Sequence, residues 1–249
     1  MSAGAFTISR KGYLALDSGI YLTYSATNGT DFAQNYFGRS IAHNCVHVYD
    51  KDETFWDKTS SSNQLVNDGG QTVIPSDPDY NAMLTLPEFS PASVLRYEDT
   101  PNYNYTQINV APAYNSSRLM SRYGKPAYTN KISAYTREFL YAKASGVFAC
   151  IDRVTAKSAS LTKTWNLHIP NTPVIPSGTF AQIAGDSSNG IAEYTGGDVV
   201  KTTSPISPSG TLFVKALLPA NRLIRKIGGT NNRTQAGGYS YWVGGINSG

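Results

Sequence analysis

The residues best suited to acid–base or metal chemistry are three histidines, His43, His47 and His168, and one aspartate, Asp17. Asp17 ends an apolar run and precedes a Ser-Gly pair. Its carboxylate either faces inward, where it needs donors or a metal, or caps the turn, and both alternatives stay open. Imidazole and carboxylate are zinc ligands, but two ligands do not complete a tetrahedral site. Each histidine taken alone is more often a hydrogen-bonded structural residue.

The spacing of the histidines and the absence of known catalytic motifs limit the kinds of site that the sequence can form. His43 and His47 are four residues apart, which on a strand places them on one face but about 13 Å from each other. The sequence contains no nucleophile elbow, phosphate-binding loop, His-Glu-x-x-His motif or dinucleotide fingerprint. Cys45 and Cys150 lie in separate apolar runs without CxxC spacing, so buried free thiols are favoured, and a disulfide stays possible.

Charge and composition exclude several classes of partner. The 249 residues carry a formal net charge of +4, and charged residues make up 15% of the chain. No run of Lys and Arg exceeds two residues, so we expect neither a nucleic-acid partner nor a polybasic membrane patch. No stretch approaches the roughly 18 apolar residues of a membrane span. An acidic polysaccharide fits the sign of the charge, which alone does not select it.

The elements that must position these residues are strands almost throughout. Short runs rich in β-branched, leucine and aromatic residues occur at residues 13–17, 45–49, 146–154 and 211–218, and turn-forming residues separate them. No window shows a sustained helical repeat of apolar residues. We therefore predict an all-β fold, a large antiparallel multi-stranded β-sandwich, as one large domain or two smaller ones. Residues 57–81 are predicted to form a long loop, and residues 177–209 a hairpin with loops.

Several segments together resemble one family. They are Gly12–Tyr21, Asn35–Asn44, Val48–Glu53, Asn67–Gln71, Tyr135–Tyr141, Ile151–Thr155, Lys163–His168, Leu212–Pro219, Lys226–Gly229 and Tyr241–Gly245. In this order they resemble the C-terminal β-sandwich domain of the heparinase II/III-like polysaccharide lyases. The resemblance covers nearly the whole chain and is weak at residues 75–125 and 176–209.

The resemblance implies an activity shared between two domains. These lyases cleave uronic-acid polysaccharides by β-elimination, at an active site between an α-helical toroid and the β-sandwich. The toroid supplies the catalytic Tyr and His, so no catalytic residue is assigned to residues 1–249. The chain is then expected to act with its own upstream α-toroid domain, and the family's last C-terminal strands are expected to be missing or shortened here. A bacterial periplasmic or secreted location follows, with the signal outside this chain.

The resemblance also implies a metal site and a substrate class. Asp17 and His43 match two zinc ligands of the family, and the third, a histidine, falls just before Met1, so the zinc site is expected to be incomplete. Asn28–Phe32 stands where the alginate-cleaving branch has a Gly-Gly-Tyr segment, which favours a glycosaminoglycan of heparin or heparan type. Arg39, Tyr36 and Arg10 are predicted to bind the acidic polysaccharide.

Two other classes of function remain as alternatives. The first is a non-catalytic carbohydrate-binding or structural β-sandwich, which the incomplete metal site and the 17 tyrosines favour. The second is an adhesin-like or coat-like surface β-protein, which would require the ordered segments to be coincidence. Equally, Arg39, Lys11 and Arg10 have a structural interpretation as solvated charges at a strand edge.

Overall fold

The computed structural model describes residues 2–18, 36, 38–56, 64–65, 67–72, 92–114, 130–176, 179–186, 191–197, 199–227, 232–235 and 239–242. Within these residues the regular elements are β-strands and short 3-10 turns, and every strand pairing is antiparallel. The predicted all-β class is therefore confirmed. No helix in this part of the chain is both long and apolar enough to cross a membrane.

The chain divides into two compact units. Unit 1 comprises Met1–Ala5, Arg39–Ile41 and Cys45–Asn166, and unit 2 comprises Phe6–Gly38, Ala42–Asn44 and Leu167–Gly249. Each unit therefore contains segments that are distant in the sequence.

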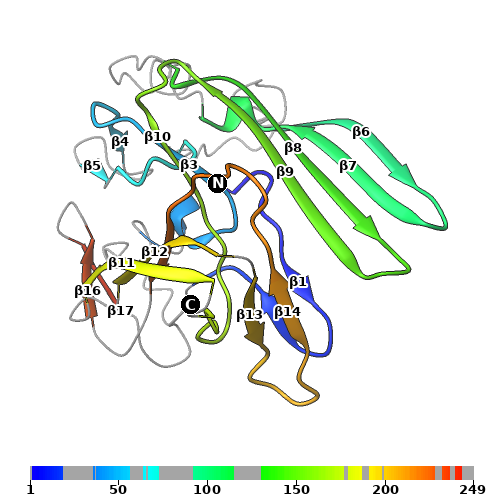
Figure 1. The fold of residues 1–249 in the computed structure, drawn as a ribbon. Coiled ribbons are helices and arrows are strands. Elements are labelled where there is room, and N and C mark those ends of the chain that lie inside the picture. Colours follow the sequence, from blue (N-terminus) through cyan, green and yellow to red (C-terminus); the bar gives the residue numbers. More distant parts are fainter. Residues whose placement is uncertain are drawn as a thin grey trace, which may run out of the picture. The chain divides into compact units, whose positions relative to one another are not determined.

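Unit 1 is built around a four-stranded meander (Figure 1). Its strands are β6 (Ser93–Asp99), β7 (Tyr103–Asn109), β8 (Ile132–Ala142) and β9 (Val147–Ala156). Two smaller pairs accompany it: β3 (Val46–Tyr49) with β10 (Thr162–Trp165), and β4 (Phe55–Trp56) with β5 (Gln64–Leu65). A 3-10 turn, η4 (Ala111–Tyr114), follows β7, and another, η2 (Ser40–Ala42), precedes β3.

The core of unit 1 packs residues of β3 against η4 and β8. Its buried residues are Val46, Val48, Val110, Ala111, Ala113, Tyr114, Ile132 and Tyr135. The rings of Tyr114 and Tyr135 lie 5.7 Å apart, and the Tyr114 hydroxyl donates to the carbonyl of Val46. This bond satisfies the polar end of a tyrosine that is only 1% exposed.

Unit 2 consists of shorter strands. The N-terminal hairpin pairs β1 (Ile8–Ser9) with β2 (Tyr13–Ala15), and a three-stranded sheet contains β11 (Phe180–Asp186), β12 (Ile191–Gly196) and β15 (Ile224–Ile227). Two further hairpins are β13 (Val200–Thr203) with β14 (Thr211–Val214), and β16 (Asn232–Gln235) with β17 (Tyr239–Trp242).

The strands predicted from sequence correspond to β2, β3, β9 and β14. Residues 177–209 contain the predicted hairpin, formed by β11 and β12, and also β13. The predicted loop at residues 57–81 is interrupted by β5, and much of it lies outside the described residues. The segment Asn28–Phe32 also lies outside them.

Candidate functional site

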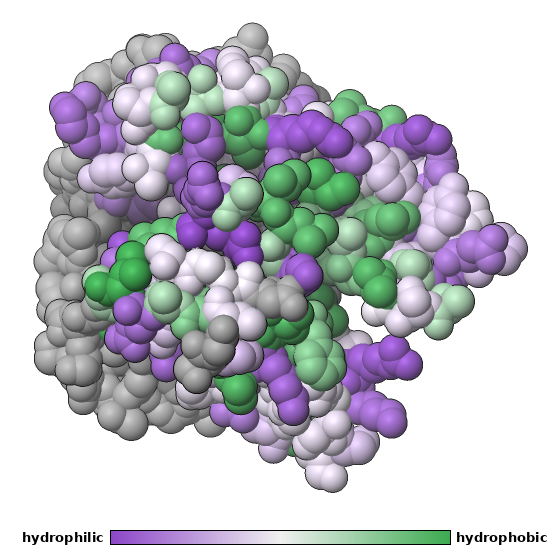
Figure 2. Space-filling view, in the orientation of Figure 1, coloured by the Kyte–Doolittle hydropathy of each residue, from purple (hydrophilic) through white to green (hydrophobic). Residues whose placement is uncertain are grey.

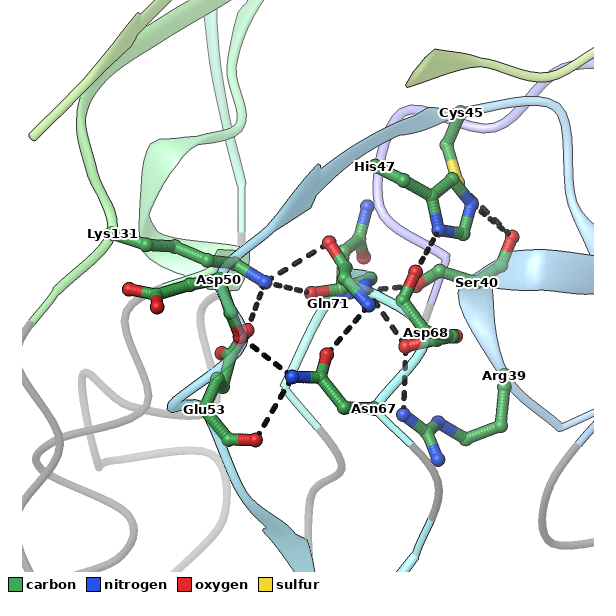
Figure 3. Close-up of polar contacts among 12 residues, drawn as sticks. Arg39, Ser40, Cys45, His47, Asp50, Glu53, Asn67, Asp68, Gln71 and Lys131 are labelled. Carbon is green, nitrogen blue, oxygen red and sulfur yellow. Dashed lines mark hydrogen bonds and ion pairs between the residues drawn. The ribbon is translucent and has the colours of Figure 1, made fainter. Parts of the chain in front are cut away.

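Unit 1 contains a group of ionisable side chains that are enclosed by protein, which we call the buried ion cluster (Figure 3). Its members are Arg39, His47, Glu53, Asp68 and Lys131. Arg39 Nη2 lies 2.8 Å from Asp68 Oδ1, and these side chains are 2% and 1% exposed. The ammonium group of Lys131, 0% exposed, is paired with Glu53.

Lys131 is also bonded to the backbone of a tight loop. Its Nζ donates to the carbonyls of Gly69, at 3.0 Å, and Gly70, at 2.9 Å. Together with Glu53 these acceptors use all three ammonium protons, which a buried lysine requires. The aromatic rings of Phe55 and Tyr114 lie 5.5 and 5.6 Å from Nζ.

The loop Asn67–Gln71 has the residue types that this arrangement needs. Gly69 has φ of +70°, and a Cβ there would lie 3.0 Å from the backbone of Tyr49. The close approach allows the amide of Val48 to donate to the Gly69 carbonyl at 2.8 Å. Asn67 donates to the carbonyls of Asp50 and Glu53. The segment that contributes to the family resemblance therefore has a clear structural role in this chain.

Removal from water shifts the pKa values of the side chains in the buried ion cluster. Burial raises the pKa of Glu53 to about 7, although Lys131 opposes the shift. The pKa of Lys131 is lowered, chiefly by burial. Burial also acts to raise the pKa of Asp68, but Arg39, His47 and the Gly70 amide outweigh it, and the net shift is downward. Because these groups are occupied by one another and closed off from water, we assign the buried ion cluster to stability and not to catalysis.

The position of Arg39 corrects its predicted role. We expected an exposed guanidinium that binds an acidic polysaccharide, but the side chain is 2% exposed, pairs with Asp68 and stacks 4.5 Å over the ring of Phe55. A polymer in solution cannot reach a group enclosed in this way, so Arg39 is a structural residue. No local pattern around Arg39 predicts this burial, because its partner Asp68 lies in a loop that is distant in the sequence.

Unit 2 contains the second polar centre, the Asp17–His43 pair. His43 Nε2 lies 3.8 Å from Asp17 Oδ2, with the side chains 15% and 48% exposed. Two ligands of a tetrahedral zinc ion, each about 2.1 Å from it, are separated by about 3.4 Å. The observed separation therefore fits a shared cation after a small side-chain movement. The structure brings these two predicted ligands together, and solvent reaches both.

No cluster of three or more His, Cys, Asp or Glu side chains able to hold a metal occurs among the described residues. The Asp17–His43 pair therefore presents two candidate ligands, fewer than the four of a tetrahedral zinc ion. His168, the remaining histidine of unit 2, does not complete such a cluster. His47 belongs to unit 1, where its ring nitrogens lie 2.9 and 3.1 Å from the carbonyls of Asp68 and Ser40.

The other two residues predicted to bind substrate, Tyr36 and Arg10, lie at different places relative to the Asp17–His43 pair. The Tyr36 hydroxyl lies 2.7 Å from Oγ of Ser18, the residue after Asp17, so Tyr36 is close to the pair. Arg10 is exposed and lies in the turn of the β1–β2 hairpin, at the opposite end of β2 from Asp17. The structure therefore associates Tyr36 with the pair and places Arg10 away from it.

We predict that Lys131 and Glu53 stabilise each other. Lys131→Met or Glu53→Leu alone leaves a buried charge and should lower the free energy of unfolding by about 3–5 kcal/mol. The double variant should lose at least about 2 kcal/mol less than the sum of the single losses. Urea denaturation measures this. Lys143→Met, which breaks the more exposed pair with Asp99, should cost under about 1 kcal/mol. Additive losses for Lys131 and Glu53 would contradict the prediction.

His47 should make stability depend on pH. Burial holds its pKa below the usual 6.5, so the unfolded chain takes up a proton that the folded chain refuses until the pH is lower. This contribution to stability is complete above the unfolded pKa and is lost as the pH falls below it. Between about pH 7.5 and about pH 5, the wild type should lose more free energy of unfolding than His47→Gln. An equal loss in both proteins would show that His47 does not titrate in this way.

Comparison with known proteins adds no family assignment. No protein-family model matches the sequence, and no curated protein matches it. Support for a function therefore comes from the Asp17–His43 pair and from the segments that carry the family resemblance.

Proposed function

We propose that this chain is the β-sandwich part of a bacterial polysaccharide lyase of the heparinase II/III-like type, exported to the periplasm or secreted. Its substrate is a uronic-acid polysaccharide of the glycosaminoglycan type. The observation that carries the proposal is the approach of Asp17 and His43, two matched zinc ligands, to 3.8 Å at a solvent-accessible position. Had these side chains lain apart, the resemblance would have had no chemical counterpart in the structure.

The reaction would divide between this chain and an α-toroid domain. In β-elimination a base removes the proton at C5 of the uronate, the C4–O bond breaks, a C4–C5 double bond forms, and the leaving oxygen takes up a proton. Groups of the toroid would perform these proton transfers. In this chain, Asp17 and His43 would hold zinc, which when bound supplies positive charge and crosslinks their two segments. The hydroxyl of Tyr36, beside Ser18, would offer a hydrogen bond to the sugar.

The proposal predicts zinc content and product formation. In the longest form of the protein that its gene encodes, His43→Ala and Asp17→Asn should each lower bound zinc at least tenfold, since each removes a direct ligand. Plasma mass spectrometry measures the metal. The wild type should release unsaturated uronate, detected by its ultraviolet absorbance, from heparan sulfate.

His168→Ala is the matched control and should keep its zinc, because it removes the other histidine of the same unit. Unchanged zinc content in His43→Ala would remove His43 from the metal site. A zinc-loaded wild type that releases no unsaturated product from any uronic-acid polysaccharide would refute the lyase.

A second candidate, a non-catalytic carbohydrate-binding domain, is favoured by one face of the meander. The register places Tyr97, Phe139, Tyr141 and Phe148 on the same face of neighbouring strands. The Phe139 and Phe148 rings stack 5.6 Å apart, and Tyr97 and Tyr141 are 65% and 38% exposed. Figure 2 shows hydrophobic residues interspersed with hydrophilic ones on the right of the view, where this sheet lies. Flat aromatic groups of this kind suit the apolar faces of sugar rings.

This candidate predicts that binding does not require turnover. Tyr97→Ala and Tyr141→Ala should each weaken binding of a uronic-acid polysaccharide in affinity electrophoresis by about tenfold, as expected for loss of an aromatic anchor. Tyr49→Ala, which removes a tyrosine that is 46% exposed elsewhere in unit 1, should bind as the wild type does. Equal binding by all four proteins would eliminate this face as the binding surface.

A further inference from the structure

The Asp17–His43 pair is held by hydrogen bonds between the residues on either side of it. Ser18, which follows Asp17, donates its backbone amide to the carbonyl of Ala42, which precedes His43, at 2.7 Å. Asn44, which follows His43, donates its side-chain amide to the carbonyl of Leu16, which precedes Asp17, at 3.3 Å. The two segments are thus connected on both sides of the pair.

Asn44 is the one side chain in this arrangement, and it makes further bonds. Its Nδ2 also donates to the carbonyl of Phe6 at 2.8 Å, and its Oδ1 accepts from the amide of His168 at 2.6 Å. The His168 carbonyl in turn accepts from the amide of Leu16 at 3.2 Å. The Asn44 side chain is 0% exposed. A short side chain with two N–H donors and one acceptor is required here, a combination that asparagine alone provides at this length.

We propose that Asn44 is a positioning residue that sets the separation of Asp17 and His43 for cation binding. The proposal rests on the proposed function, because it concerns the same metal ligands. Neither Asp17 nor His43 lies in a regular strand, so no sheet ladder holds them. With the Asn44 amide in place, the Nε2–Oδ2 separation of 3.8 Å stays close to the value that a shared cation needs. Residues that orient metal ligands typically change metal affinity 10–100-fold when they are replaced.

The alternative is that Asn44 contributes only to stability, as any buried amide does. Gln71 provides a matched comparison in unit 1: it is 1% exposed, and its side chain donates to and accepts from the backbone of Ala3 at 2.7 Å in each direction. If burial and backbone bonding were the whole role of Asn44, replacing either amide would have the same consequences for metal binding.

The test uses the longest form of the protein that the gene encodes and measures two quantities. Zinc affinity is measured by competition with a chromophoric chelator, and stability by urea denaturation in EDTA. Asn44→Asp keeps the size of the side chain and removes both N–H donors, and it should weaken zinc binding at least tenfold. Its cobalt(II) visible spectrum should also change, because the ligand geometry changes. Gln71→Glu should lose stability and keep the zinc affinity and cobalt spectrum of the wild type.

The results distinguish failure of the positioning role of Asn44 from failure of the Asp17–His43 metal site. If Asn44→Asp binds zinc as the wild type does while His43→Ala does not, the positioning role is wrong and the metal pair stands. If the wild type itself binds no zinc, the metal pair and the positioning role both fail. If Asn44→Asp does not fold, zinc affinity is measured for Asn44→Ser instead. In addition, the side-chain amide of Asn44 is followed by NMR in the wild type. The side-chain amide protons of Asn44 should exchange slowly in the zinc-loaded protein, and rapid exchange there would overturn the proposal.

Discussion

Unit 1 depends on the interactions of the buried Lys131 ammonium group, which is held away from water. Lys131 lies directly before β8, the strand that pairs with both β7 and β9, and its acceptors come from Glu53 and from the Gly69–Gly70 loop. A buried charge is tolerated only when its partners are fixed in place. The Gly69–Gly70 loop, the start of β8 and the segment before β4 must therefore assume their positions together, and the positive φ of Gly69 is part of the same requirement.

The two polar centres contain similar residue types but differ in access to solvent. The charges of the buried ion cluster are enclosed and face one another, so their interaction energy goes into the fold. Asp17 and His43 meet at a position where one side chain is 48% exposed, so solvent reaches them. Access to solvent, and not residue type, distinguishes the two centres. The family resemblance predicted that Asp17 and His43 lie together, and they are 3.8 Å apart. Arg39 was predicted at the surface because a distant acidic partner has no local signature in the sequence.

Strands were predictable from the sequence where the residues of the strand itself favour β-structure. The strand β9 (Val147–Ala156) begins with a run of consecutive apolar residues, Val147–Ile151, and the structure extends the strand predicted at residues 146–154 as far as Ala156. In contrast, β7 (Tyr103–Asn109) contains three polar amide side chains and two tyrosines, and all seven of its residues are half-buried. It is a strand because neighbours on both sides, β6 and β8, pair with its backbone. That stabilisation is nonlocal, so propensity along the chain does not reveal it.

The two cysteines give unit 1 an intrinsic reporter of its own opening. Cys45 is 1% exposed, and burial raises the pKa of its thiol to about 12; Cys150, in β9, is partly exposed, and burial raises its pKa to about 12 as well. Both are therefore almost entirely thiols near neutral pH, and alkylating reagents attack thiolates. Alkylation of Cys45 must follow separation of β3 from its surroundings, whereas Cys150 needs only fraying of the meander. The ratio of the two labelling rates would thus distinguish local from global motion without any added probe.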